Sequence, residues 1–124
     1  MPIFVDTQAI VWAVTGNSRL SRAAREALTD GGEDIFVSAV TAYEFVDLNR
    51  RGRFEVDLPF RLVLEQLEAK VLDYPSSAWT IAETLPPIHF DQVDRMLIAH
   101  AIHARVTLVT ADTKMRSYPV LSIW

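Results

Sequence analysis

Four acidic residues from separate parts of the chain follow predicted β-strands or begin the helices after them. They are Asp6 after residues 3–5, Glu44 in the first predicted turn after residues 34–38, Asp94 in the first turn of a predicted helix at 91–104, and Asp112 after residues 107–110. Ligands of open α/β sheets bind outside the carboxyl ends of the strands. We therefore expect the four side chains to meet at one edge of the sheet.

Such a cluster predicts a particular chemistry. Like charges held close together raise one another's pKa, so the arrangement is unfavourable without cations. Oxygen ligands without cysteine suit Mg²⁺ or Mn²⁺. A pair of such ions can stabilise the attacking and leaving oxygens when a phosphodiester bond is displaced in line. The cluster therefore indicates metal-dependent phosphodiester hydrolysis.

Each acid also has a simpler structural explanation. Asp6 can be the N-cap of the next helix, Thr41 and Glu44 match a capping box, and Asp94 can charge the N-terminus of its helix. Asp112 can be an Asx-turn residue. These explanations account for each position locally, but they give no reason for four carboxylates to share one edge.

The apolar pattern predicts the elements that position these residues. Short apolar runs at 3–5, 34–38, 71–75, 107–110 and 120–123 are typical of buried strands. Helical patterns lie between them, at 7–14, at 21–28 before Gly31 and Gly32, at 41–51, from Leu58, from Ser76 or Ser77 to 85, and at 91–104. This alternation predicts an α/β fold, a three-layer α/β/α sandwich with a central, mostly parallel sheet of four to five strands.

The composition limits the class of protein. A chain of 124 residues, half of them hydrophobic, is expected to form a single domain over residues 1–124. The absence of cysteine excludes disulfides and thiolate metal sites. No apolar stretch approaches the length of a membrane span and no targeting segment is evident, so we expect a cytoplasmic protein. The net charge of −4 argues against a nucleic-acid ligand unless bound cations offset it.

Four stretches resemble, in order, the motifs of PIN-domain ribonucleases, and within that family the VapC-type toxins of toxin–antitoxin pairs. They are Phe4-Val5-Asp6-Thr7, residues 37–44, residues 89–99 with the pattern His-x-Asp-x-x-Asp-Arg, and Leu108-Val109-Thr110-Ala111-Asp112. The resemblance extends over nearly the whole chain, and the stretch at 89–99 is its most specific part. Gln92 departs from it, standing where proline is common in the family.

The resemblance implies roles for individual residues. Asp6, Glu44 and Asp94 match the three most dependable acids of the family, and Asp112 matches a fourth, more variable one. Thr7 and Ser38 match hydroxyl positions that help to orient the acids. The family implies an endoribonuclease that depends on Mg²⁺, or on Mn²⁺ in its place. It also implies structured RNA as substrate (tRNA, rRNA or mRNA), a homodimer, and inhibition by a small VapB-like antitoxin.

Other interpretations remain open beside this one. A non-catalytic PIN module that binds RNA or protein is the main alternative, although such a module is expected to have lost an acid. A phosphoacceptor domain or a dehalogenase-like phosphatase would need a second acid close after Asp6, where Thr7 and Gln8 stand. His100 and His103 are interpreted as surface residues rather than a metal pair. His89 is given only a weak positioning role.

Overall fold

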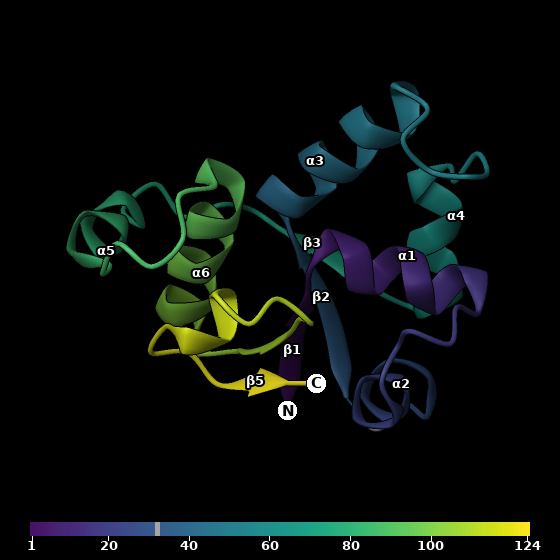
Figure 1. Ribbon diagram of the computed structural model, residues 1–124, viewed down its shortest axis with the longest axis horizontal. Helices are drawn as coiled ribbons and strands as arrows, with labels where there is room; N and C mark the ends of the chain where they lie inside the picture. Colours follow the sequence, from purple (N-terminus) through teal and green to yellow (C-terminus); the bar gives the residue numbers. More distant parts are fainter. Residues whose placement is uncertain (32) are drawn as a thin grey trace.

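The alternating pattern of strands and helices folds into one parallel sheet with helices on both faces, as the computed structural model shows for residues 1–31 and 33–124 (Figure 1). The described residues form five strands: β1 (Pro2–Val5), β2 (Asp34–Ser38), β3 (Lys70–Leu72), β4 (Thr107–Val109) and β5 (Ser122–Ile123). Their order across the sheet is β3-β2-β1-β4-β5, and every neighbouring pair is parallel. The predicted α/β/α sandwich is confirmed.

Within the described ranges, six α-helices connect the strands: α1 (Thr7–Thr15), α2 (Arg22–Thr29), α3 (Ala39–Arg50), α4 (Phe60–Leu67), α5 (Trp79–Thr84) and α6 (Gln92–Ala104). A short 3-10 helix, η1 (Met115–Ser117), follows β4. The predicted stop of the second helix includes Gly32, which lies outside the described residues. Among the described residues, no helix is long and apolar enough to cross a membrane.

The alternation of side chains along β1 explains the two hydrophobic layers. Ile3 and Val5 point to one face, where they join a core formed with α1, α2 and α4. Phe4 points to the other face and packs with Leu108 and the apolar side of α6. Figure 1 shows α5 and α6 on one side of the sheet and α1, α2 and α4 on the other. Both faces of the short central strands are therefore buried, which explains their continuous apolar sequence.

The strand order also determines where a ligand can bind. The chain moves outward from β1 through β2 to β3 and then returns to place β4 on the opposite side of β1. The direction of winding reverses between β1 and β4, and crevices form at the carboxyl ends of strands at such a reversal. The register pairs Val5 with Val109, so Asp6 and Thr110 leave the sheet side by side.

Several predicted boundaries differ from the structure, among them those of the third and last strands and of the third helix. The third strand is shorter than predicted, because residues 73–75 continue without strand pairing towards α5. The last strand likewise contains only Ser122 and Ile123. The third helix begins earlier than predicted, at Ala39, because Ser38 caps it by accepting a hydrogen bond from the amide of Val40 at 3.3 Å.

Candidate active site

Asp6 is both a helix cap and a member of the carboxylate cluster. Its Oδ1 accepts a hydrogen bond from the amide of Ala9 at 2.8 Å, which caps α1. Its Oδ2 accepts a hydrogen bond from the hydroxyl of Thr110. The side chain is buried, and burial raises its pKa, with smaller increases from the charges of Asp112 and Glu44. The two hydrogen bonds oppose this rise because they favour the charged carboxylate.

Glu44 reaches the same region from α3, but not from the position that the sequence predicted. Because α3 begins at Ala39, Glu44 lies in the second turn and the interpretation as a capping box with Thr41 is wrong. Thr41 is buried inside the helix, with 1% of its surface exposed. The Oε1 of Glu44 instead accepts a hydrogen bond from the hydroxyl of Thr7 at the start of α1. The helix therefore presents Glu44 to α1 rather than to its own N-terminus.

Two acids lie at the start of α6, and the structure shows that Asp91 caps the helix while Asp94 belongs to the carboxylate cluster. The Oδ1 of Asp91 accepts a hydrogen bond from the amide of Asp94 at 2.9 Å, so Asp91 is the N-cap of α6. The carboxylate of Asp94 lies 2.9 Å from the Nε2 of His89. Burial, followed by the charges of Asp91, Glu44 and Asp112, raises the pKa of Asp94 to about 7 against the opposing effect of His89. A buried carboxylate with a raised pKa beside other acids is a candidate for a functional site.

Asp112 also has two roles, because it holds a turn through one carboxylate oxygen and belongs to the carboxylate cluster through the other. Its Oδ1 accepts hydrogen bonds from the amides of Lys114 at 2.8 Å and Met115 at 3.1 Å, which hold the start of η1. Its Oδ2 lies 3.1 Å from the Nε2 of His89. The predicted Asx turn is therefore present, and it leaves one oxygen directed towards His89.

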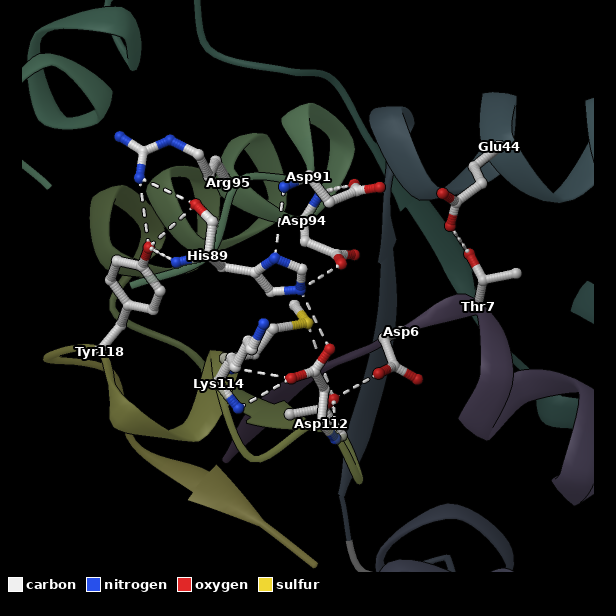
Figure 2. Close-up of polar contacts among 12 residues, drawn as sticks. Asp6, Thr7, Glu44, His89, Asp91, Asp94, Arg95, Asp112, Lys114 and Tyr118 are labelled. Carbon is white, nitrogen blue, oxygen red and sulfur yellow. Dashed lines mark hydrogen bonds and ion pairs between the residues drawn. The ribbon is translucent and has the colours of Figure 1, made fainter. Parts of the chain in front are cut away.

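The structure brings all four predicted acids to one pocket. This pocket has a volume of about 390 Å³ and is lined by Asp6, Thr7, Gln8, Glu44, Leu48, Phe54, Asp94, Ala111, Asp112 and Met115. Figure 2 shows the acids arriving from β1, α3, α6 and the segment after β4. A larger groove of about 630 Å³ shares Gln8, Leu48 and Phe54 with it and runs along α1. We consider the smaller pocket the candidate site because the carboxylates line it.

The two hydroxyl residues named from the sequence occupy different places. Thr7 donates directly to Glu44 within the site. Ser38 lies 2.7 Å from the Nδ1 of His100, and among the described residues its hydrogen bonds go to no carboxylate. Its contribution to the site is through α3, because it caps the helix that carries Glu44.

Sequence reasoning undervalued three residues. His100 is buried rather than on the surface, packs against Phe4, and has a pKa lowered to about 4 by burial and by the charge of His103. His89 contacts two of the four carboxylates. Thr110 contacts a third, and the parallel register of β1 and β4 is the signal that would have placed it there.

The donor set fits a divalent cation. Carboxylate oxygens line the pocket, and burial, with smaller contributions from the charges of neighbouring acids, raises the pKa values of Asp6 and Asp94. A ring nitrogen of His89 and carboxylate oxygens of Asp94 and Asp112 lie within 4.8 Å of one another, so these two acids are close enough to share one ion. Hard, small cations such as Mg²⁺ and Mn²⁺ favour carboxylate oxygens of this kind.

Solved structures provide a first comparison for this geometry. VapBC2 from Rickettsia felis, bound to a DNA fragment from its promoter, aligns with a TM-score of 0.67 at 16% identity, covering 98% of this chain and 97% of that chain. VapC20 from Mycobacterium tuberculosis, described as a sarcin-ricin loop cleaving toxin, aligns with a TM-score of 0.66 at 17% identity, covering 93% of each. VapBC-1 from nontypeable Haemophilus influenzae aligns with a TM-score of 0.58 at 18% identity, covering 98% and 96%. These similarities show a shared fold.

Sequence comparison gives the family. No curated protein matches the sequence. The PIN domain family, in contrast, matches residues 3–121. That match contains β2, β3 and β4, nearly all of β1, and each of the four acids in the pocket. The chain therefore belongs to the PIN-domain family.

Proposed function

We propose that residues 1–124 form one nuclease domain that hydrolyses phosphodiester bonds in structured RNA with the help of Mg²⁺, for which Mn²⁺ can substitute. The observation that carries the proposal is the convergence of Asp6, Glu44, Asp94 and Asp112 on one pocket at the carboxyl ends of β1 and β4. Membership of the PIN family and the resemblance to VapC20, a toxin described as cleaving the sarcin-ricin loop, support RNA as the substrate.

The four carboxylates would hold the metal, and the chain's own hydrogen bonds prepare them for it. When bound, the metal supplies a positive charge that activates water and stabilises the phosphate in the transition state. Thr110 and the amide of Ala9 hold Asp6, and Thr7 holds Glu44. Asp112 is held by two backbone amides of the following turn. These contacts reduce the movement that the acids must make when a cation binds.

We further propose that the chain is the toxin of a toxin–antitoxin pair, acts as a homodimer in the cytoplasm, and is inhibited by a small VapB-like antitoxin. The fold shared with VapBC2 and VapBC-1 supports this proposal. Expression of the chain alone should arrest growth, and co-expression of the small protein encoded beside it should restore growth. Normal growth with soluble, active protein would contradict the toxin role.

The test of the chemistry is cleavage of a structured RNA by the purified protein. We expect cleavage at few positions, only with Mg²⁺ or Mn²⁺, with a 5′-phosphate and a 3′-hydroxyl at the cut, because an activated water is the nucleophile. Sequencing of the new 5′ ends identifies the positions. Cleavage in EDTA, or 2′,3′-cyclic phosphate products, would contradict the mechanism. RNA binding without cleavage would favour a non-catalytic module instead.

A further inference from the structure

His89 lies between two of the carboxylates and connects two separate elements of the fold. Its Nε2 is 2.9 Å from the Oδ2 of Asp94 in α6 and 3.1 Å from the Oδ2 of Asp112 after β4. The side chain is largely buried, with 14% of its surface exposed. Figure 2 shows the imidazole ring reaching both acids with the same nitrogen. One side chain therefore sets the position of Asp94 relative to Asp112.

The hydrogen bond on the other ring nitrogen decides what His89 can do there. The amide of Asp91 donates to Nδ1 at 3.2 Å, so the lone pair of the neutral ring is on Nδ1 and the hydrogen is on Nε2. Nε2 can then donate to the two carboxylates, but a nitrogen that carries a hydrogen has no lone pair for a metal. In this arrangement His89 is a hydrogen-bond donor to the proposed ligands rather than a ligand.

The backbone of His89 is held as firmly as its ring. Its amide donates to the Oη of Tyr118 at 2.7 Å, and its carbonyl accepts from the guanidinium of Arg95 at 3.3 Å. Arg95 also donates to Tyr118, as Figure 2 shows, at 3.2 Å. It donates further to the carbonyls of Pro86 and Ala82, each at 3.2 Å. These contacts of Arg95 and Tyr118 hold the loop before α6, so the ring has little freedom to leave the carboxylates.

We propose that His89 is a positioning residue of the carboxylate site, which holds one oxygen of Asp94 and one of Asp112 so that their remaining lone pairs face a divalent cation. This inference rests on the proposed function. Hydrogen-bond partners of metal ligands typically change metal affinity 10–100-fold when they are removed. The same range is expected here because two ligands lose their common donor at once.

Titration of the purified protein with Mn²⁺, followed by the electron paramagnetic resonance signal of the free ion, measures the affinity. His89→Leu should weaken binding by about 10–100-fold. His89→Gln should stay within about threefold of wild type, because its amide nitrogen can occupy the place of Nε2. His103→Leu is the matched control, since His103 is an exposed histidine of α6 outside the pocket. Equal Mn²⁺ affinity of wild type and His89→Leu would overturn the role of His89 alone.

A spectroscopic measurement on the wild-type protein separates a donor from a ligand. Pulsed paramagnetic resonance of the Mn²⁺ complex should show no directly coordinated nitrogen, and a strongly coupled ¹⁴N nucleus would overturn the proposal by making His89 a ligand. Absence of Mn²⁺ binding by wild type would instead overturn the proposed function and this inference with it. If His89→Leu does not fold, Tyr118→Phe tests the same chain of contacts. It removes the hydroxyl that holds the His89 amide and should weaken Mn²⁺ binding by a few-fold, whereas unchanged affinity would contradict the proposal.

Discussion

The two halves of the carboxylate site are held by different kinds of hydrogen-bond donor. In the half formed by β1 and α3, the hydroxyls of Thr110 and Thr7 hold Asp6 and Glu44. In the half formed by α6 and the segment after β4, an imidazole contacts both Asp94 and Asp112. Thr110 follows the end of β4 and Thr7 begins α1, whereas the imidazole is on a loop that Arg95 and Tyr118 hold in place.

The two halves also differ in which part of the fold places the donor beside the acid. The hydroxyl half follows directly from the sheet, because the register of β1 and β4 places Thr110 beside Asp6. The imidazole half depends on side-chain contacts that hold a loop, since the hydroxyl of Tyr118 accepts from the amide of His89. We expect changes in the hydroxyl half to act mainly on stability, and changes in the imidazole half to act mainly on metal binding.

The largest expected effect is the loss of activity when a carboxylate of either half is neutralised. Asp6→Asn should reduce RNA cleavage by about 10³-fold, because a metal contributes several kcal/mol of transition-state stabilisation and each 1.4 kcal/mol corresponds to a factor of ten. Single-turnover cleavage at saturating Mg²⁺ measures the change. Asp57→Asn is a suitable control, since Asp57 is exposed and outside the pocket. Near-normal cleavage by Asp6→Asn would remove that acid from the site.

A smaller effect is expected at Asp94 in the metal-free protein, where neutralising the carboxylate should increase stability. Its pKa is raised from 3.8 to about 7 in the fold, so ionisation costs stability as the pH rises above about 4, and the cost increases until about pH 7. Asp94→Asn should therefore be more stable than wild type by about 2 kcal/mol at pH 7, less than the full shift because water still reaches the side chain. The advantage should disappear near pH 4.

Melting curves with and without Mg²⁺ at pH 4 and pH 7 measure this prediction. Mg²⁺ should stabilise wild type more than Asp94→Asn, because a ligand stabilises only the state that binds it. Asp91→Ala provides the contrast at pH 4, where Asp94 is protonated, since it removes the N-cap of α6 and should destabilise the protein by about 1 kcal/mol. At pH 7 without metal, the loss should be smaller because the charge of Asp91 no longer repels Asp94. A metal-free Asp94→Asn protein that melts below wild type at pH 7 would indicate that Asp94 serves the helix rather than the cluster.

In the hydroxyl half, Thr110→Val tests the contact with Asp6. The substitution keeps the shape of the side chain but removes the donor to a buried carboxylate, which should cost about 1–2 kcal/mol at neutral pH. Because a lost hydrogen bond also raises the pKa of Asp6 further, the loss of stability should be smaller at pH 4 than at pH 7. Urea unfolding at the two pH values checks this. The same loss at both values would show that Thr110 acts through packing alone.

The smallest effect on the site is expected at Ser38. Ser38→Ala removes the cap of α3 and the partner of His100, which should lower stability by about 1 kcal/mol. Because Ser38 contacts no carboxylate among the described residues, Mn²⁺ affinity should stay within about twofold of wild type. Parallel unfolding and Mn²⁺ titrations compare it with Thr110→Val. A clear loss of Mn²⁺ affinity would show that Ser38 orients the acids after all.

Local patterns in the sequence determined the alternation of elements and the positions of the acids near strand ends. Short apolar runs specify buried strands because both faces of the sheet are covered, and this predicts where Asp6 and Asp112 leave the sheet. The caps at Asp6, Asp91 and Asp112 are also local, since each accepts hydrogen bonds from amides two or three residues ahead. The sequence therefore predicts both helix caps and a carboxylate cluster. It does not show whether a given acid is a cap, a member of the cluster, or both.

Only the tertiary structure decided which donor reaches which acid. Thr7 is 37 residues from Glu44, and Thr110 is 104 residues from Asp6, so neither pair has a local signal. His89 and His100 show the same limit, because both are single histidines beside α6 or within it, yet one faces two carboxylates and the other is buried against Phe4 and Ser38. Their surroundings come from strand order and helix packing, which depend on the summed burial of the whole core rather than on the residues near each histidine.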